Sequence, residues 1–529
     1  MIMYGIVSLI LLCFSILSNV WMSTIDPRTD MTTLRKKNEE DYHDNEDDGV
    51  RNVVRPNELE TEHHDKLDML GKMDQHKEFD ILTREFLSEY DADTVLYKHE
   101  RTGMEVLSIL WKNNTEERTY SKKHKDTKED HEATYISEER VFGISFRTPP
   151  SSQNGLPHIL EHSVLCGSQK FPVKDPFLHL KKSSLHTYLN AMTFPDRTVY
   201  AVASRNQQDF YNLVNVYLDA VFFPLCVMDN GTILQQEGWH YDLTNTEEEE
   251  QRTVLEYSGI VLNEMKGAFY SPDHILQQHT NEAIFPDTVY RFTAGGDPAH
   301  IPDLNYEEMV NYHNTFYHPS NAKVYVSGLQ SEEEEEFWQL LNDYLKGFDK
   351  KQDIATLSQI SFQPKSITTA KTERYPYPSD SESPSHMMLT TWLLNDKELL
   401  SPFEELTWTV LEHLLIGTPT AILRKTLMES GLGNDLADGT GFQVGLLQNT
   451  FSIGLQQVAT TQDIPVIEML ILEILQEVVE QGFSAEDIAA AINTIEFQVG
   501  QPKRLFLYMF PFLSIFVGML LIVRIYYFK

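Results

Sequence analysis

The spacing of apolar and polar residues predicts a protein in which strands and helices alternate. Between residues 79 and 349, runs with an apolar residue at every second position predict strands, and runs with apolar residues three or four apart predict helices. The predicted strands lie at 95–97, 104–111, 141–148, 197–203 and 321–328. The predicted helices lie at 185–190, 206–223 and 253–278, and a further acidic amphipathic helix ends at Leu345. Together these elements predict a first α+β unit, at residues 79–349.

A second run of residues, 385–499, repeats this order of elements. Its predicted strands lie at 386–392 and 448–455, and its predicted helices at 402–415, 464–480 and 485–499. The segment between the two runs, 350–384, ends in a cluster of prolines and is predicted to be a linker. The expected fold class is therefore α+β, with two similar units in which an antiparallel sheet packs against helices.

Both ends of the chain are apolar. Residues 1–25 predict a signal peptide or signal anchor, because the stretch to residue 22 carries no charged side chain. Residues 26–78 are acidic and poor in aromatic side chains, and they are predicted to be disordered. Residues 500–529 form an apolar tail, in which 505–523 is an uncharged stretch long enough to span a bilayer. This tail has two interpretations, a membrane anchor or an artefact of a truncated gene model.

Net charge and cysteine content narrow the classes of function. The formal net charge of -36 argues against nucleic acid or an anionic membrane surface as a partner. The chain has 3 cysteines, Cys13, Cys166 and Cys226, which are too few and too far apart for a disulfide scaffold or a thiolate zinc site. A metal site in this chain would therefore use histidines and carboxylates.

The segment His158-Ile-Leu-Glu-His162 reads H-x-x-E-H, the reverse of the commoner zinc-protease helix motif. On a helix, His158 and His162 lie on one face and could share one zinc ion, with Glu161 placed to take a proton from a water on that ion. The alternative is a surface helix with two solvated histidines. The motif follows a predicted strand and a turn, and Pro157 lies at the helix start. This arrangement favours a metal site, because it would hold the helix rigidly in place. Two histidines leave such a site one protein ligand short, with a fourth position open for water.

Glu264 is the candidate for the missing ligand. It lies in a predicted helix among apolar neighbours, where an unpaired carboxylate is unfavourable. The alternative from the local pattern is a glutamate on an exposed helix face that pairs with Lys266. The residues alone leave both interpretations open.

Five stretches resemble the presequence protease branch of the pitrilysin-type (M16) zinc peptidases. They are residues 158–172, 216–224, 236–240, 259–269 and 317–322. The resemblance runs from about residue 80 to 498, and it implies an M16-type sandwich fold whose first unit is catalytic and whose second unit has no ligands. It also implies that His158, His162 and Glu264 bind one Zn²⁺ ion and that Glu161 is the general base. Asn190 and Ala191 resemble the family's edge strand, which aligns substrate backbone, although an ordinary loop is the alternative.

The resemblance implies a zinc metalloendopeptidase that degrades short unfolded peptides, such as cleaved targeting peptides. The family encloses peptides between two similar halves, and this chain resembles the first half alone, which suggests either instability or a partner chain that supplies the other half. The alternatives are a non-catalytic peptide-binding or scaffold subunit and a membrane-tethered fragment without function. The resemblance implies a mitochondrial location, whereas the leader and tail favour a plastid or a secretory or membrane location.

Overall fold

The computed structural model describes residues 78–87, 92–111, 139–245, 253–330, 333–363, 370–378 and 385–500. The predicted leader, the predicted disordered segment up to residue 77 and the apolar tail from residue 501 lie outside the described residues. The described chain divides into a larger unit, Glu78–Ser401 with Gly431–Ile464 and residues 496–500, and a smaller unit, Pro402–Ser430 with Pro465–Ile495.

A seven-stranded sheet is the centre of the larger unit in the described residues. Its strands stand in the order β1 (Phe79–Leu87), β2 (Ala92–His99), β3 (Glu105–Trp111), β9 (Ala322–Ser327), β4 (Arg140–Arg147), β6 (Arg197–Ser204) and β5 (His186–Thr193). All neighbours pair antiparallel except β3 and β9, which are parallel. A parallel pair needs a long crossover connection. Here that crossover carries every candidate site residue.

Six α-helices of the described chain share the main hydrophobic core with this sheet. They are α4 (Leu156–Val164), α6 (Gln207–Phe222), α7 (Thr232–Glu237), α8 (Ile260–Ala268), α10 (Tyr306–Phe316) and α11 (Glu334–Leu345). Helix α6 begins after Asn206, whose side chain caps the helix by accepting a hydrogen bond from the Asp209 backbone at 2.9 Å. Apolar residues at helical spacing then bury one long face against the strands.

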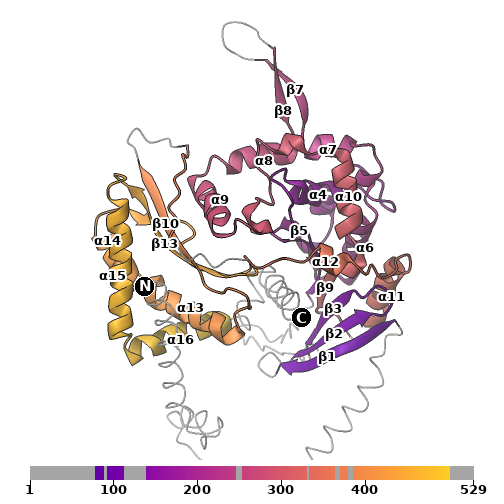
Figure 1. Cartoon of the computed structure of the whole chain (residues 1–529). Coiled ribbons are helices and arrows are strands. Elements are labelled where there is room, and N and C mark those ends of the chain that lie inside the picture. The colour runs from indigo at the N-terminus through magenta and orange to yellow at the C-terminus, as the bar shows by residue number, and fades with distance from the viewer. Residues whose placement is uncertain are drawn as a thin grey trace, which may run out of the picture. The chain divides into compact units, whose positions relative to one another are not determined.

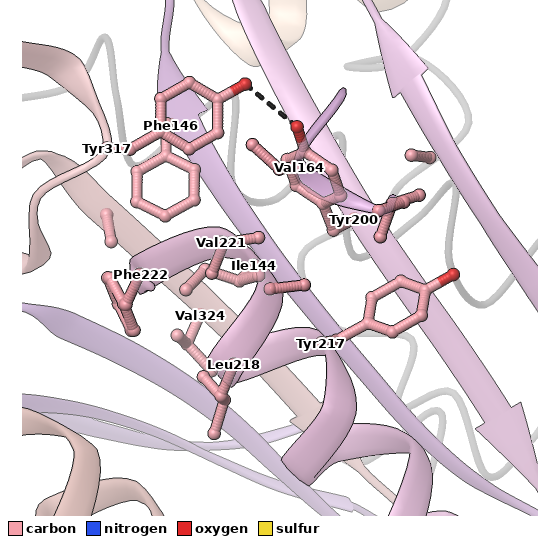
Figure 2. Packing of buried hydrophobic residues seen from close by; sticks show 14 of the residues in the cluster. Ile144, Phe146, Val164, Tyr200, Tyr217, Leu218, Val221, Phe222, Tyr317 and Val324 are labelled. Atoms are coloured by element: carbon pink, nitrogen blue, oxygen red, sulfur yellow. Dashed lines mark hydrogen bonds between the residues drawn. The ribbon is translucent and has the colours of Figure 1, made fainter. Parts of the chain in front are cut away.

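Figure 2 shows this core, in which residues of α6 meet residues of β4, β6 and β9. Two tyrosines at its centre, Tyr200 and Tyr317, bring hydroxyl groups into an apolar interior. Their oxygens lie 2.9 Å apart and share a hydrogen bond, so neither is left unpaired. The core therefore holds α4 firmly against the sheet, because Ile159, Leu160 and Val164 of α4 are fully buried in it.

Further helices and strands of the larger unit lie in the crossover and just after β9. They are α5 (Pro176–Ser183), η2 (Leu225–Val227), β7 (His240–Asn245), β8 (Thr253–Ser258), α9 (Pro272–Ile284), η3 (Val289–Arg291), η4 (Ile301–Asp303), η5 (Pro319–Asn321) and α12 (Ile354–Leu357). Strands β7 and β8 form an antiparallel hairpin that projects away from α7 and α8 (Figure 1).

A second, four-stranded sheet among the described residues contains β10 (His386–Leu393), β11 (Asp435–Leu436), β12 (Gly441–Gln443) and β13 (Thr450–Val458). The smaller unit is helical, with α13 (Pro402–Ile416), α14 (Ile422–Glu429), most of α15 (Ile464–Gln481) and most of α16 (Ala485–Gly500). Val410 of α13 packs against Ala491 and Ile495 of α16. Among the residues that the structure describes, no helix combines the length and the apolarity that a membrane crossing requires.

The predicted strands at 95–97, 104–111, 141–148, 197–203 and 321–328 are confirmed as β2, β3, β4, β6 and β9, and those of the second run as β10 and β13. The helices predicted at 206–223, 402–415, 464–480 and 485–499 and the helix ending at Leu345 are confirmed as well. The α+β fold class is thus correct. The domain boundaries around the segment 350–384 stay a prediction.

Two predicted helices are wrong. The helix expected at 185–190 is the strand β5, because Tyr188 and Ala191 pair with Ala203 and Tyr200 of β6, and this pairing overrides a weak local preference. The helix expected at 253–278 is in fact β8, α8 and the first part of α9. The chain turns at Gly259, and α9 starts anew at Ser271, whose hydroxyl accepts a hydrogen bond from the His274 backbone.

Candidate metal centre

Helix α4 carries the H-x-x-E-H motif and begins in a tightly packed turn. Gly155 precedes it with φ 67°, in the left-handed region that favours glycine, and Pro157 occupies the first turn. A Cβ atom on Gly155 would lie 2.7 Å from the carbonyl oxygen of Gly295. The loop at Gly295 and Gly296 is therefore pressed against the start of the helix, which fixes where the first histidine stands.

The two histidines of α4 lie one helical turn apart, as the spacing predicts. The ring centroids of His158 and His162 are 4.9 Å apart, with an angle of 82° between the ring planes. Both rings are largely shielded from solvent. Burial lowers the pKa of His158, and the positive charge of a protonated His162 lowers it further against the opposing effect of Glu264. His158 therefore favours the neutral form that a metal ion requires.

Glu264 on α8 faces these two rings. One carboxylate oxygen lies 3.8 Å from Nε2 of His158, and the other lies 3.8 Å from Nε2 of His162. The buried face of α8 consists of Val261, Leu262 and Met265, and the Glu264 side chain is 55% exposed. The carboxylate thus lies on the solvent-exposed side of the site.

The alternative partner for Glu264 is engaged elsewhere. The ammonium group of Lys266 donates a hydrogen bond to the carbonyl oxygen of Tyr257 at 2.8 Å, at the end of strand β8. Glu264 instead stands opposite two imidazole nitrogens, so the exposed ion pair that the local pattern allowed is not the arrangement found.

One potential ligand atom from each of His158, His162 and Glu264 lies within 4.8 Å of the other two. Two imidazoles and one carboxylate are a donor set that zinc uses in catalytic sites, where a fourth position stays open. The inner side of the site is buried and the outer side is exposed, so a substrate could approach that position. These residues fit a zinc ion.

The opposite edge of the His162 ring contacts a carboxylate that the sequence did not single out. Nδ1 of His162 lies 3.4 Å from an oxygen of Glu237, at the end of α7, and the Glu237 side chain is nearly inaccessible. Burial alone would lower the pKa of His162, but the hydrogen bond to Glu237 and the nearby carboxylates raise it above its usual value. Burial would raise the pKa of Glu237, and its bonds with His162 and Cys166 lower it overall.

Glu161 lies beside the histidines and is 7% exposed. The hydroxyl of Thr193, the last residue of β5, donates a hydrogen bond to Oε2 of Glu161 at 2.7 Å. Burial raises the pKa of this carboxyl, although the bond from Thr193 works in the opposite direction. A carboxyl that is buried, oriented and easier to protonate than usual suits a group that takes up and returns a proton.

Asn190 and Ala191 lie on β5, at the edge of the seven-stranded sheet, and α4 packs beside this strand. In the part of the chain that the structure describes, β6 is the only strand that pairs with β5. The Asn190 side chain is exposed and the Ala191 side chain is buried. The expected edge strand is therefore present, and the alternative of a loop is excluded.

The sequence reasoning missed Glu237, Thr193 and Gly295 as neighbours of the site. Glu237 and Thr193 lay within stretches already noted, 236–240 and the edge strand, but no local periodicity marks either as a partner of α4. The contacts arise because α7, β5 and the loop at Gly295 converge on one helix, which only tertiary packing decides.

Known families match two parts of the chain. Residues 146–261 match the model of Insulinase (Peptidase family M16), and residues 303–495 match that of the Peptidase M16 inactive domain. The solved structure of pitrilysin is similar with a TM-score of 0.50 at 15% sequence identity, over 79% of this chain and 40% of that one. This last similarity concerns the fold.

Presequence protease 1, chloroplastic/mitochondrial, from Arabidopsis thaliana is 43% identical over 423 residues, which are 80% of this chain and 36% of that protein. Protein HypA from Clostridium perfringens is 37% identical, over 80% of this chain and 40% of its own length. The mitochondrial presequence protease of Mus musculus is 36% identical, over 68% of this chain and 34% of its own length. This chain is therefore a presequence protease-like member of the M16 peptidase family. It spans less than half the length of these relatives.

Proposed function

We propose that this protein is a zinc metalloendopeptidase that acts on short unfolded peptides, such as cleaved targeting peptides. The observation that carries the proposal is the convergence of His158, His162 and Glu264, with their ligand atoms within 4.8 Å of one another and a buried carboxyl, Glu161, beside them. Membership of a peptidase family supports it independently.

Three side chains would hold the metal ion. They are His158 and His162, each through Nε2, and Glu264 through its carboxylate. Bound zinc would polarise the carbonyl of the scissile bond and make a water molecule more acidic. Glu161 would take the proton of the attacking water and then pass it to the amine that leaves. Thr193 keeps the Glu161 carboxylate in one orientation throughout, because its hydroxyl donates to Oε2.

The edge of β5 supports the choice of unfolded peptides as substrates. An extended peptide can add to the free edge of a sheet through backbone hydrogen bonds, with its side chains in alternate directions. Asn190 and Ala191 lie in this strand, which packs beside the helix that carries the motif. Only a chain segment free of its own secondary structure can pair in this way, so a folded protein would be a poor substrate.

The names of the relatives favour a mitochondrial location, with a plastid as the alternative, because they describe mitochondrial or chloroplastic presequence proteases. A second candidate function is a non-catalytic peptide-binding or scaffold subunit. The observation in its favour is the match of residues 303–495 to the model of the Peptidase M16 inactive domain. In either case a partner chain that supplies the remaining half stays a proposal.

Metal analysis and a cleavage assay on the full 529-residue chain test the proposal. We expect about one zinc per chain and cleavage of an internally quenched unstructured peptide that stops with a chelator and returns with added zinc. Zinc without cleavage would favour the non-catalytic subunit. Absence of stoichiometric zinc would refute the metal centre itself.

A further inference from the structure

We propose that the β7–β8 hairpin is a docking site for a second stretch of the peptide substrate, an extended segment in which apolar and basic side chains alternate. This segment adds to the outer edge of the hairpin as a third strand. The inference rests on the proposed function, because the segment belongs to the peptide that is cleaved. It adds a binding surface outside the metal centre and outside the edge of β5.

One face of the hairpin is apolar and open to solvent. The cross-strand partners on this face are Tyr241 with Tyr257 and Leu243 with Leu255. Their exposed fractions are 58%, 43%, 66% and 60%, in that order. Single exposed apolar residues are ordinary, but a contiguous apolar patch that stands out from a protein marks an interaction site. The hairpin therefore presents a surface that a ligand with apolar side chains would cover.

The opposite face of the hairpin places two carboxylates across from each other. Asp242 of β7 and Glu256 of β8 are cross-strand partners, and both side chains are exposed. Like charges directly opposite each other destabilise a pair of strands. Among the residues that the structure describes, neither carboxylate forms an ion pair. A basic side chain bound beside them would relieve the repulsion, so this face favours a cationic ligand.

The edges of the hairpin explain why the ligand is an extended peptide. Within the described chain β7 and β8 form a sheet of two strands, so each has an outer edge without a strand partner. A lone two-stranded hairpin is marginally stable in water, and a third strand stabilises it. Successive side chains of a strand point to opposite faces. A peptide that adds to the edge therefore places one set of its side chains beside the apolar face and the other set beside the two carboxylates.

The base of the hairpin is fixed to the body of the larger unit. The indole N–H of Trp239 donates a hydrogen bond to the carbonyl oxygen of Leu304 at 2.9 Å. The Trp239 ring also contacts the rings of Tyr241 and Tyr257, at centroid distances of 5.8 Å and 5.6 Å. On the other side, Lys266 of α8 bonds to the backbone of β8. The docking surface is therefore preformed, which lowers the entropy cost of binding a peptide.

The hairpin is continuous with the helix that carries the proposed third metal ligand. Strand β8 ends at Ser258, and α8 begins at Ile260. The Ile260 side chain is 47% exposed and lies one helical turn before Glu264, so the two residues share one face of α8. Strand β8 has 6 residues, which is a length of about 20 Å at about 3.3 Å per residue. A peptide needs about six residues beyond its cleaved part to cover the hairpin.

Charge favours the substrate over a second copy of this chain as the ligand. A second copy would bring its own Asp242 and Glu256 to the same surface, and each chain has a formal net charge of -36. Mitochondrial targeting peptides, in contrast, are amphipathic, rich in arginine and poor in acidic residues. The chemistry of the hairpin matches such a peptide on both faces.

Peptide binding to the full chain in the presence of a chelator is the first test, because it requires neither zinc nor cleavage. The probe is a fluorescent peptide in which leucine and arginine alternate, and anisotropy measures its affinity. We expect Leu243→Thr and Leu255→Thr each to weaken binding by about fivefold to tenfold, because less apolar area is buried. The matched control is Leu357→Thr at an exposed leucine of α12, which should bind the probe like the parent chain.

Methylation of the probe backbone tests whether the peptide adds as a strand. N-methyl groups at every second residue remove the N–H donors on one edge of an extended peptide and keep its side chains. One of the two possible registers should weaken binding by at least about tenfold, and the other should have a much smaller effect, because only one edge pairs with the hairpin. Equal affinity of both methylated probes and the unmodified probe would overturn strand addition.

Replacing arginine by citrulline in the probe tests the role of the two carboxylates. Citrulline has nearly the same shape as arginine and no charge. The parent chain should prefer the arginine probe by about threefold to fivefold, as exposed ion pairs allow. The double variant Asp242→Asn with Glu256→Gln should lose this preference. Its control is Glu468→Gln with Glu473→Gln on α15, where both side chains are exposed, and this control should keep the preference.

Cleavage kinetics link the hairpin to the metal centre. Two quenched peptides share one cleaved segment, and one of them carries an extension in which leucine and arginine alternate. In the parent chain the extension should lower KM by about tenfold and change kcat little, because it adds binding energy away from the scissile bond. Leu255→Thr should raise KM for the extended peptide several-fold more than for the short one. A KM that does not depend on the extension would overturn the proposal.

The outcomes separate this inference from the proposed function. If the parent chain binds the probe through the hairpin but cleaves no peptide, the docking site stands and the proposed function fails. If it cleaves peptides but Leu243→Thr and Leu255→Thr bind the probe as tightly as the parent chain, the docking site is refuted alone. Sedimentation that shows a dimer dissociating in these two variants, with unchanged affinity for the probe, would make the face an interface between copies and would also overturn the proposal. Unfolding midpoints check that every variant is folded.

Discussion

Replacing Glu161 by glutamine separates catalysis from metal binding at this site. Glutamine has almost the same shape as glutamate, and its carbonyl oxygen can still accept the hydrogen bond that Thr193 donates to Oε2 at 2.7 Å. Glu161 is not one of the three residues whose ligand atoms converge. The change therefore removes the proton acceptor and leaves the proposed ligands in place.

The magnitude follows from the role of a general base. A positioned base contributes about 10²-fold to 10⁴-fold to the rate, which corresponds to about 3–5 kcal/mol in the activation free energy. The amide cannot take up the proton, so Glu161→Gln should lose at least the lower value in kcat/KM. Burial raises the pKa of the carboxyl, which means that its charged form is unfavourable there. A neutral side chain should therefore not lower the free energy of unfolding.

Three measurements on one preparation test whether Glu161 acts in catalysis and not in metal binding. They are kcat/KM on a quenched unstructured peptide, zinc content by elemental analysis, and the unfolding midpoint. Glu307→Gln, at an exposed position in the first turn of α10, is a control for the loss of one negative charge and should match the parent chain in all three. Turnover within tenfold of the parent value, or loss of zinc from Glu161→Gln, would contradict the role assigned to Glu161.

Three further predictions follow from other features of the larger unit. His158→Ala should lose the metal, and elemental analysis that still finds about one zinc per chain would exclude His158 as a ligand. Gly155→Ala should lower the free energy of unfolding by about 1–3 kcal/mol, because a side chain there needs φ 67° and meets the Gly295 carbonyl. The control is Gly267→Ala in α8, where a Cβ atom meets no atom within 4 Å, so this substitution should stabilise the helix. The packing argument would be refuted if urea unfolding showed Gly155→Ala to be the more stable of the two variants. His313 is buried and donates a hydrogen bond from Nε2 to the Val221 carbonyl oxygen at 2.9 Å, and burial lowers its pKa from 6.5 to about 4. As the pH falls, the unfolded chain therefore protonates at His313 before the folded chain does. The free energy of unfolding of the parent chain should fall by about 1.4 kcal/mol through His313 between about pH 7.5 and about pH 5.5. Urea titrations of His313→Gln should not show this loss.

The hydrogen bond of His313 explains why its ring is neutral in the folded chain. A carbonyl oxygen accepts, so Nε2 of His313 donates to Val221 and carries the proton of the neutral ring. A second proton would have to sit on Nδ1, which is buried and makes no hydrogen bond within ordinary geometry. That is the physical reason for the low pKa and for the direction of the pH dependence.

Several elements were predictable because their signal is local. Strands such as β4 and β9 have an apolar residue at every second position, and α6 has a cap at Asn206 and apolar residues at helical spacing. Strand β5 was not predictable in the same way. Its eight residues contain too little alternation to exclude a helix, and pairing with β6 decides the outcome.

For the site, the sequence alone determined the motif and the spacing that puts His158 and His162 on one face of a helix, since four residues make about one turn. Resemblance then pointed to Glu264. Only the tertiary structure decided that Glu264 faces the two rings while Lys266 bonds to Tyr257, and that Glu237 and Thr193 support His162 and Glu161. The physical reason is that periodicity reports which face of an element is apolar, whereas a metal centre depends on how separate elements pack against one another.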